Sequence, residues 1–176
     1  MKKFVLFALL FFSARANAQS VMGIKFGSSI ETVKQQLEQR LGKYSVSKNN
    51  GTLSINDFTM GDFHFDFGDF YFQYYGDNSY FNEVFFQCYS NKNDVEKMKS
   101  NRDYLYSIIK NKYTYLEEYV NDQGFKCYKF GINPLDESRV LGLITLERAE
   151  SKGGDIRLYL TLHYLPIYYI DKSSDF

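Results

Sequence analysis

The sequence predicts an α+β domain in which one antiparallel sheet carries two helices on one face. Two segments, 29–41 and 94–112, repeat apolar residues at helical spacing, and each precedes several segments in which apolar and polar residues alternate. The chain holds 17 Phe and 16 Tyr but only 2 Pro. Without a linker-like stretch, residues 19–176 are expected to form a single domain, and the order of elements allows two tandem helix-plus-meander halves at about 19–90 and 91–166.

The first eighteen residues are predicted to be a cleaved secretory signal peptide. Lys2 and Lys3 precede an unbroken apolar run over 4–12, and Ala16-Asn17-Ala18 forms a small-x-small cleavage site. This run is far shorter than the roughly 20 residues of a membrane-spanning helix. The first cysteine is Cys88, too distant for lipid attachment at the new N-terminus. We therefore expect a periplasmic or secreted protein without a membrane anchor.

Segment 29–41 has the pattern of an amphipathic helix. Its apolar residues share one face: Ile30, Val33, Leu37 and Leu41. Ser28 and Glu31 have the spacing of a capping box, and Gly42 stands where a left-handed C-cap would end the helix. The second helix, over about 94–112, has Asn93 and Glu96 as its expected N-cap pair.

The residues between the two helices are predicted to form strands. Tyr44–Lys48 and Thr52–Ile55 flank Asn49-Asn50-Gly51, a good hairpin turn. In segment 63–75, the aromatic residues that alternate before Gly68 and those that alternate after it would fall on opposite faces of a regular strand. Two explanations fit this change of phase. A two-residue turn at Gly68-Asp69 would place six rings on one side, and a bulge at Gly68 within one longer strand would also switch the face. Tyr80–Tyr89 is predicted to follow as a strand, with Val84 and Phe86 inward.

Four more strands are expected after the second helix. They cover Leu116–Asn121, Phe125–Ile132, Arg139–Arg148 and Asp155–Leu165. In the last of these, the inward residues are predicted to be Ile156, Leu158, Leu160, Leu162 and Tyr164. Arg157, Tyr159, Thr161 and His163 would then point outward, and residues 167–176 would form a tail.

The entry into the first helix resembles that of two bacterial envelope families. Gly27-Ser28-Ser29 leads into a helix with Val33 and Leu37 that ends at Leu41-Gly42 before strands. This is similar to the secreted β-lactamase inhibitor proteins and to the small outer-membrane assembly lipoproteins related to them in architecture. The resemblance implies two tandem helix-plus-sheet units whose strands form a concave surface that grips a protein partner.

Charge argues against nucleic acid as a partner. Loss of Lys2, Lys3 and Arg15 with the signal peptide lowers the formal net charge from 0 to −3. The chain has no Lys or Arg between Lys48 and Lys92, while residues 55–85 contain six acids: Asp57, Asp62, Asp66, Asp69, Asp77 and Glu83. These acids indicate either a surface for a basic partner or cation, or protection of Phe-rich strands against aggregation, and we favour the second.

The two cysteines, Cys88 and Cys127, fall in different halves of the chain. In an oxidising compartment they could form a disulfide that closes a loop of about 40 residues and stabilises the fold by about 4 kcal/mol. Two separate buried thiols are equally compatible with their positions in strands.

Few residues have the pattern of a catalytic or metal site. The run Asp62, His64, Asp66 looks like a metal motif, but residues i and i+4 of a strand lie about 13 Å apart, so we expect solvated side chains and no metal. The sequence has no G-x-S-x-G, Walker or H-E-x-x-H motif, and no cofactor is expected.

We therefore expect a non-enzymatic binding protein that uses the uncovered face of its sheet to bind another protein. Large rigid aromatic rings bury area at small entropic cost, which suits such a surface. The candidate contact residues are Tyr71, Gln73, Tyr75, Phe85, Tyr159 and His163. The alternative is a small periplasmic hydrolase that uses Asp or His groups on the same face, and a third hypothesis is an architectural subunit.

Overall fold

The computed structural model describes residues 20–42, 46–151 and 153–168. The predicted signal peptide, Tyr44 in the first predicted strand, and residues 169–176 of the predicted tail lie outside these ranges. Within them, the α+β fold class is confirmed: two helices accompany an antiparallel sheet of eight strands and a short two-stranded sheet.

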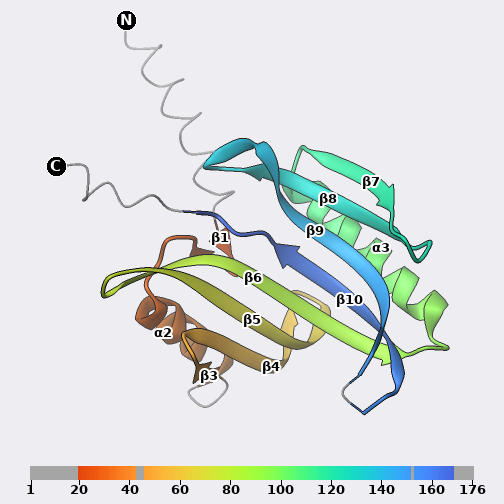
Figure 1. The fold of residues 1–176 in the computed structure, drawn as a ribbon, viewed down its shortest axis with the longest axis horizontal. Helices are drawn as coiled ribbons and strands as arrows, with labels where there is room; N and C mark the ends of the chain where they lie inside the picture. The colour runs from red at the N-terminus through yellow and green to blue at the C-terminus, as the bar shows by residue number, and fades with distance from the viewer. Residues whose placement is uncertain (1–19, 43–45, 152, 169–176) are drawn as a thin grey trace, which may run out of the picture.

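The eight strands follow the order β3-β4-β5-β6-β10-β9-β8-β7 across the sheet (Figure 1). The helices are α2 (Ile30–Leu41) and α3 (Val95–Lys112), and the small sheet pairs β1 (Ser20–Val21) with β2 (Ile24–Lys25). The first four strands of the large sheet are β3 (Val46–Asn49), β4 (Thr52–Met60), β5 (Phe63–Tyr75) and β6 (Asn78–Asn91). The other four are β7 (Leu116–Val120), β8 (Lys126–Asn133), β9 (Asp136–Glu150) and β10 (Ile156–Tyr164).

The sheet consists of two meanders that meet at one seam. Helix α2 precedes the meander β3 to β6, and helix α3 precedes the meander β7 to β10. The seam is the antiparallel pairing of β6 with β10, which runs from Val84 opposite Tyr164 to Asn91 opposite Arg157. The last strand of the second meander therefore lies in the middle of the sheet.

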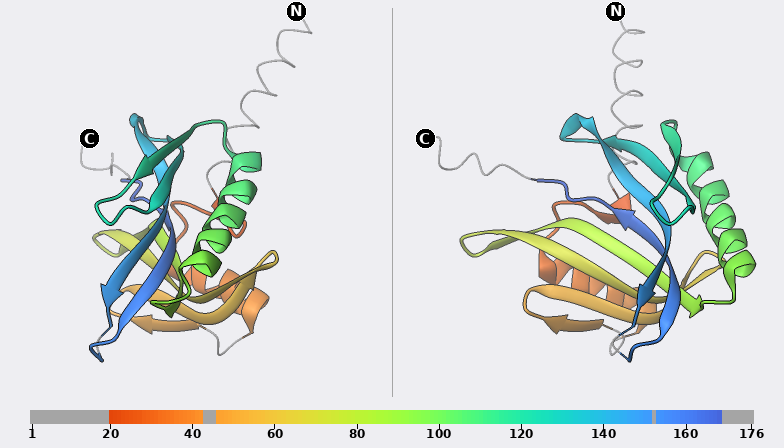
Figure 2. Two further views of the ribbon diagram at one scale, coloured as in Figure 1. Left: turned by 90° about the vertical axis from the view of Figure 1, so that its right-hand side faces the viewer. Right: turned by 45° about the vertical axis from the view of Figure 1, so that its right-hand side comes forward.

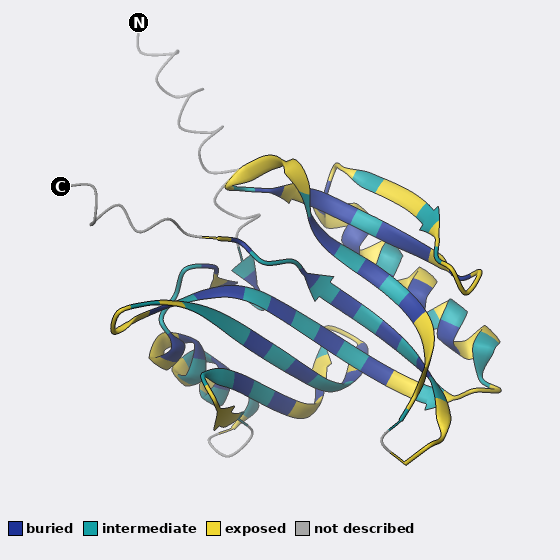
Figure 3. Ribbon diagram, viewed as in Figure 1, coloured by how far each residue is buried: buried dark blue, intermediate teal, exposed yellow. Residues whose placement is uncertain are grey.

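Both helices cover the same face of the sheet, as the sequence predicted (Figure 2). Helix α2 buries Ile30, Val33 and Leu37, and helix α3 buries Met98, Leu105 and Ile109. They pack on one continuous apolar core, whose fully buried aromatic side chains are Phe65, Phe70, Phe81, Phe86 and Phe130. The opposite face of the sheet carries no helix among the described residues, and the central strands alternate between buried residues and partly exposed ones (Figure 3).

The N-cap of each helix lies one residue later than predicted. Ser29, not Ser28, is the N-cap of α2, and its Oγ accepts a hydrogen bond from the Thr32 amide at 3.3 Å. Ser28 instead uses its carbonyl to accept the Phe81 amide at 2.8 Å, which ties the helix entry to β6. At α3 the N-cap is Asp94 rather than Asn93. Gly42 ends α2 with a φ of 99°, as predicted.

Strand β5 runs unbroken through residues 63–75, so the predicted alternative of a turn at Gly68-Asp69 is wrong. Phe65 and Gly68 both face the core, and Phe67 between them faces the other side, where its ring contacts Phe85 at 5.8 Å. A Cβ at Gly68 would lie 2.6 Å from the Phe86 ring. A larger residue would therefore not fit at this core position without a shift of the Phe86 ring. The six rings do not share one side, and Tyr74 is 49% exposed.

The four later strands lie where they were predicted, within three residues at each end. In β10 the inward positions of Leu158, Leu160, Leu162 and Tyr164 are confirmed by their burial. Ile156 is the exception, at 51% exposed. It pairs with Glu150 of β9 but lies beyond the last residue of β6 that pairs with β10, so no strand covers its second side.

Of the two alternatives for the cysteines, the structure has the second: Cys88 and Cys127 are free, buried thiols, and the disulfide is absent. Strands β10 and β9 separate β6 from β8, which puts the two cysteines three strand spacings apart, or about 14 Å. Cys88 pairs with Leu160 and faces the core, whereas Cys127 is neighbour to the core residue Tyr128 and points the other way. A disulfide requires Cα atoms within about 7 Å, so these positions cannot be bridged.

Candidate functional site

The six predicted contact residues all lie, partly exposed, on the face of the sheet that the helices leave open. Strand β5 presents Tyr71, Gln73 and Tyr75, strand β6 presents Phe85, and strand β10 presents Tyr159 and His163. Their common face follows from the alternation of each strand, since the residues between them, such as Phe70, Phe86 and Leu162, belong to the core. We call this surface the open face.

Three of these residues meet at the centre of the open face. Phe85 packs its ring edge-on against His163, with centroids 6.2 Å apart, and Tyr71 stacks on Phe85 at 5.8 Å. His163 Nε2 lies 2.8 Å from Glu83 Oε1, which joins β10 to β6 across the seam. Phe67 closes the group on the other side of Phe85. These five side chains form what we call the His163 cluster.

The other predicted residues lie away from this centre. The amide of Gln73 donates a hydrogen bond to the Tyr75 hydroxyl, near the hairpin that joins β5 to β6. Tyr159 lies toward the opposite end of β10, where its ring contacts Tyr89 at 6.2 Å. Arg157 covers the Tyr89 ring at 5.0 Å. The candidate residues therefore extend along the strands rather than forming one compact site.

Glu83, Phe67 and Tyr89 were missed as members of the site. Glu83 and Phe85 are two apart in one strand, so a shared face could have been anticipated. The pairing of Glu83 with His163 depends on the register between β6 and β10, which are separated by about eighty residues in the sequence and carry no local signal of their pairing. Phe67 continues the alternation of Phe63 and Phe65, which by itself does not indicate that β5 changes face before Gly68.

The open face around Tyr71 is acidic. Burial raises the pKa of the Tyr71 hydroxyl, and the nearby carboxylates of Asp69 and Glu83 raise it further. Tyr71 therefore stays protonated at neutral pH and can donate a hydrogen bond beside two acceptors. Of the six acids in residues 55–85, Asp66 accepts the Tyr89 amide at 2.8 Å and Glu83 pairs with His163, so at least two have structural partners.

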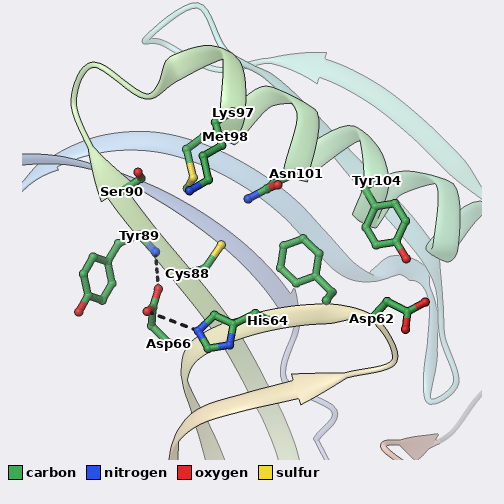
Figure 4. A pocket seen from close by; sticks show the side chains of 11 residues that line it. Asp62, His64, Asp66, Cys88, Tyr89, Ser90, Lys97, Met98, Asn101 and Tyr104 are labelled. Carbon is green, nitrogen blue, oxygen red and sulfur yellow. Dashed lines mark hydrogen bonds and ion pairs between the residues drawn. The ribbon is translucent and has the colours of Figure 1, made fainter.

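A cavity of about 460 Å³ lies between helix α3, strand β6 and the β4–β5 hairpin (Figure 4). Asp62, His64 and Asp66 approach it from the hairpin, and Lys97 and Asn101 approach it from α3 (Figure 4). Its remaining lining residues are Phe63, Cys88, Tyr89, Ser90, Met98 and Tyr104. The cavity thus combines charged walls with an apolar part.

The Asp62, His64, Asp66 run does not form a metal site. His64 lies 3.8 Å from Asp66 through Nε2 and 3.8 Å from Asp57 through Nδ1, on opposite sides of its ring. Asp66 turns its Oδ2 to the Tyr89 amide. Within residues 20–42, 46–151 and 153–168, no group of three or more His, Cys, Asp or Glu side chains could hold a metal ion.

Cys88 does not have the properties of a nucleophile, although His64 and Asp66 line the same cavity. Burial and, to a smaller extent, the Asp66 carboxylate raise the pKa of its thiol to about 12, although Lys97 acts in the opposite direction. Nearly all of the thiol is therefore protonated at neutral pH, and the thiolate is the reactive form. The hydroxyl of Ser90, at the cavity edge, bonds to the Asp94 carboxylate.

Comparison with protein-family models, with curated proteins and with solved structures gave no match. The resemblance to the secreted β-lactamase inhibitor proteins therefore stays a prediction from the sequence. In the part of the chain that the structure describes, neither helix is both long and apolar enough to cross a membrane.

Proposed function

We propose that this chain is a non-enzymatic binding protein whose open face binds another protein. The observation that supports this most is the His163 cluster, a group of half-buried rings on a sheet face without a covering helix. Aromatic residues are enriched at protein interfaces because they bury large areas and lose little side-chain entropy. The same use of a sheet surface is what the resemblance to the inhibitor proteins implies.

The size of the open face suits a protein partner. Eight strands give seven spacings of about 4.8 Å, and a nine-residue strand is about 30 Å long, so the face covers roughly 1,000 Å². A standard interface buries about 800 Å² on each partner. The central strands β5, β6 and β10 carry most of the aromatic side chains. Arg157 lies at one end of β10, and Lys129 lies on β8, next to the edge strand β7. This distribution matches an aromatic interface centre with a polar rim.

Site-specific photo-crosslinking would test the proposal. A photoreactive phenylalanine analogue is placed at Tyr71, at Tyr159, or at Ile108, which is 41% exposed on α3 and serves as the matched control. The three proteins are exposed to envelope extract and to culture fluid, and the adducts are identified by mass spectrometry. We expect the same partner to be captured from positions 71 and 159 and not from 108. Identical adducts at all three positions, or no adducts at any, would contradict the proposal.

The alternative of a small hydrolase receives less support from these contacts. Its requirement is an activated nucleophile beside a His, and the Cys88 thiol at the His64 cavity is held protonated. Turnover of generic ester or glycoside substrates by the purified protein, lost in a His64→Ala variant and retained in Tyr159→Ala, would establish this alternative instead.

A further inference from the structure

We propose that the cavity between α3 and the β4–β5 hairpin binds a small zwitterion, an amino acid or a short peptide with free termini. This site borders the open face at Tyr89, and its ligand is a different one from the protein partner proposed above. The argument depends on the charges of the two walls, on the apolar part of the cavity, and on its size.

The walls of the cavity carry opposite charges. The hairpin wall contributes the carboxylates of Asp62 and Asp66, and the helix wall contributes the ammonium group of Lys97 and the amide of Asn101 (Figure 4). The Cys88 thiol lines the same cavity as Asp66 and Lys97 (Figure 4). A ligand ammonium group on the hairpin side and a carboxylate on the helix side would satisfy both walls at once.

The charged groups on the two walls are available to a ligand. Lys97 has no ion pair among the described residues, whereas Lys99, two residues later, bonds to Glu96 at 2.8 Å. Asp66 uses Oδ2 for the Tyr89 amide, and its Oδ1 has only His64 nearby, at 3.8 Å. Lys97 also lies in the first turn of α3, where the helix dipole favours a negative group.

The opposed charges exclude simpler ligands. An anion bound by Lys97 would share the cavity with the Asp66 carboxylate, and a cation bound by Asp66 would share it with Lys97. Such like-charge contacts oppose binding in a partly desolvated site. A molecule that carries both charges avoids this penalty.

The volume and the apolar part favour a peptide-sized ligand with an apolar side chain. The cavity of about 460 Å³ lies within the range typical of small-molecule sites, roughly 300–1,000 Å³. Phe63 and Tyr104 stack at 6.1 Å on one side, and Met98 lies on the helix wall. These side chains offer an apolar surface to an aliphatic ligand side chain.

Titration of the ¹⁵N-labelled protein with the dipeptide Ala-Leu, followed by two-dimensional NMR, tests the proposal. We expect saturable shifts of the amide signals of Tyr89, Ser90, Lys97 and Asn101. The doubly blocked analogue, acetyl-Ala-Leu-amide, is expected to produce none. Loss of one charge-assisted hydrogen bond weakens binding about tenfold, so Lys97→Gln should raise Kd by this factor. Lys99→Gln is the matched control and should leave Kd within about twofold.

The Lys97 side chain is exposed, and the Lys99 side chain bonds only to Glu96 on the surface of the same helix, so both variants are expected to fold. Three outcomes would overturn the proposal: no saturable shift with the free dipeptide, equal binding of the blocked analogue, or shifts located away from the cavity. An equal effect of Lys97→Gln and Lys99→Gln would do the same, since it would indicate nonspecific attraction to a basic helix.

Discussion

Replacing Gly142 by Ala tests the packing of the sheet at one defined point. Gly142 lies in β9, opposite Phe130 of β8 and Tyr164 of β10. A Cβ built on this residue would lie 2.4 Å from Cζ of Phe130 and 2.5 Å from the backbone oxygen of His163. Phe130 is fully buried, and the His163 oxygen belongs to the central strand, so neither group can turn aside.

The expected cost follows from these two contacts. Overpacking of a core costs about 1–3 kcal/mol, and the backbone contact places this substitution at the upper end, about 3 kcal/mol. The lower entropy of unfolded Ala returns up to about 1 kcal/mol. The net loss in the free energy of unfolding is therefore about 2 kcal/mol, which for a chain of this size lowers Tm by about 4–8 °C.

Urea denaturation followed by circular dichroism measures this loss. The control is Gly153→Ala, because the nearest atom to a Cβ there is Ser151 Oγ at 3.8 Å, and we expect its stability to change by less than about 0.5 kcal/mol. If Gly142→Ala unfolds within about 0.5 kcal/mol of Gly153→Ala, the close packing of β8, β9 and β10 at this position is wrong.

Three further predictions concern other parts of the molecule. Alkylation without reductant should label both Cys88 and Cys127 after denaturation, and a denatured protein without two free thiols would refute this. In the native protein, the pKa of about 12 should slow the alkylation of Cys88 about 1,000-fold at pH 8 relative to an ordinary thiol. Arg102→Ala should lower the free energy of unfolding in urea by about 2–3 kcal/mol, because the buried guanidinium donates hydrogen bonds to Asp103 and to the Lys126 carbonyl. A loss below about 0.5 kcal/mol would contradict this role. Burial raises the pKa values of Tyr119 and Tyr128 to about 12, so their contribution to stability should be complete below pH 10 and lost between pH 10 and 12. Tyrosinate absorbance and Tm measured across this pH range test this, and ionisation of all tyrosines near pH 10 in the folded protein would contradict it.

The α+β class could be predicted because its signals are local. The helical spacing of Ile30, Val33 and Leu37 and the alternation of Leu158, Leu160 and Leu162 each report one buried face, and in each case the structure buries the residues that the pattern selects. Both helix caps were misplaced by one residue. At α2 the cause is a distant contact, since Ser28 is engaged by Phe81 of β6.

The open face could be predicted in composition but not in arrangement. Alternation alone placed Tyr71, Phe85 and His163 on the side away from the core. Their contact with one another depends on β10 inserting beside β6, and a pairing across so many residues leaves no trace in either strand alone. The same register explains the cysteines, which are compatible with a bridge in sequence and are kept apart by two intervening strands.

The central position of β10 also has a consequence for the order of assembly. During synthesis, the meander β3 to β6 is complete about 65 residues before its neighbour β10 appears, so the edge of β6 has no partner strand in the meantime. Loss of β10 would split the sheet through its middle instead of shortening one edge. Strand β10 is therefore the element that joins two half-sheets with unpaired edges into one continuous sheet.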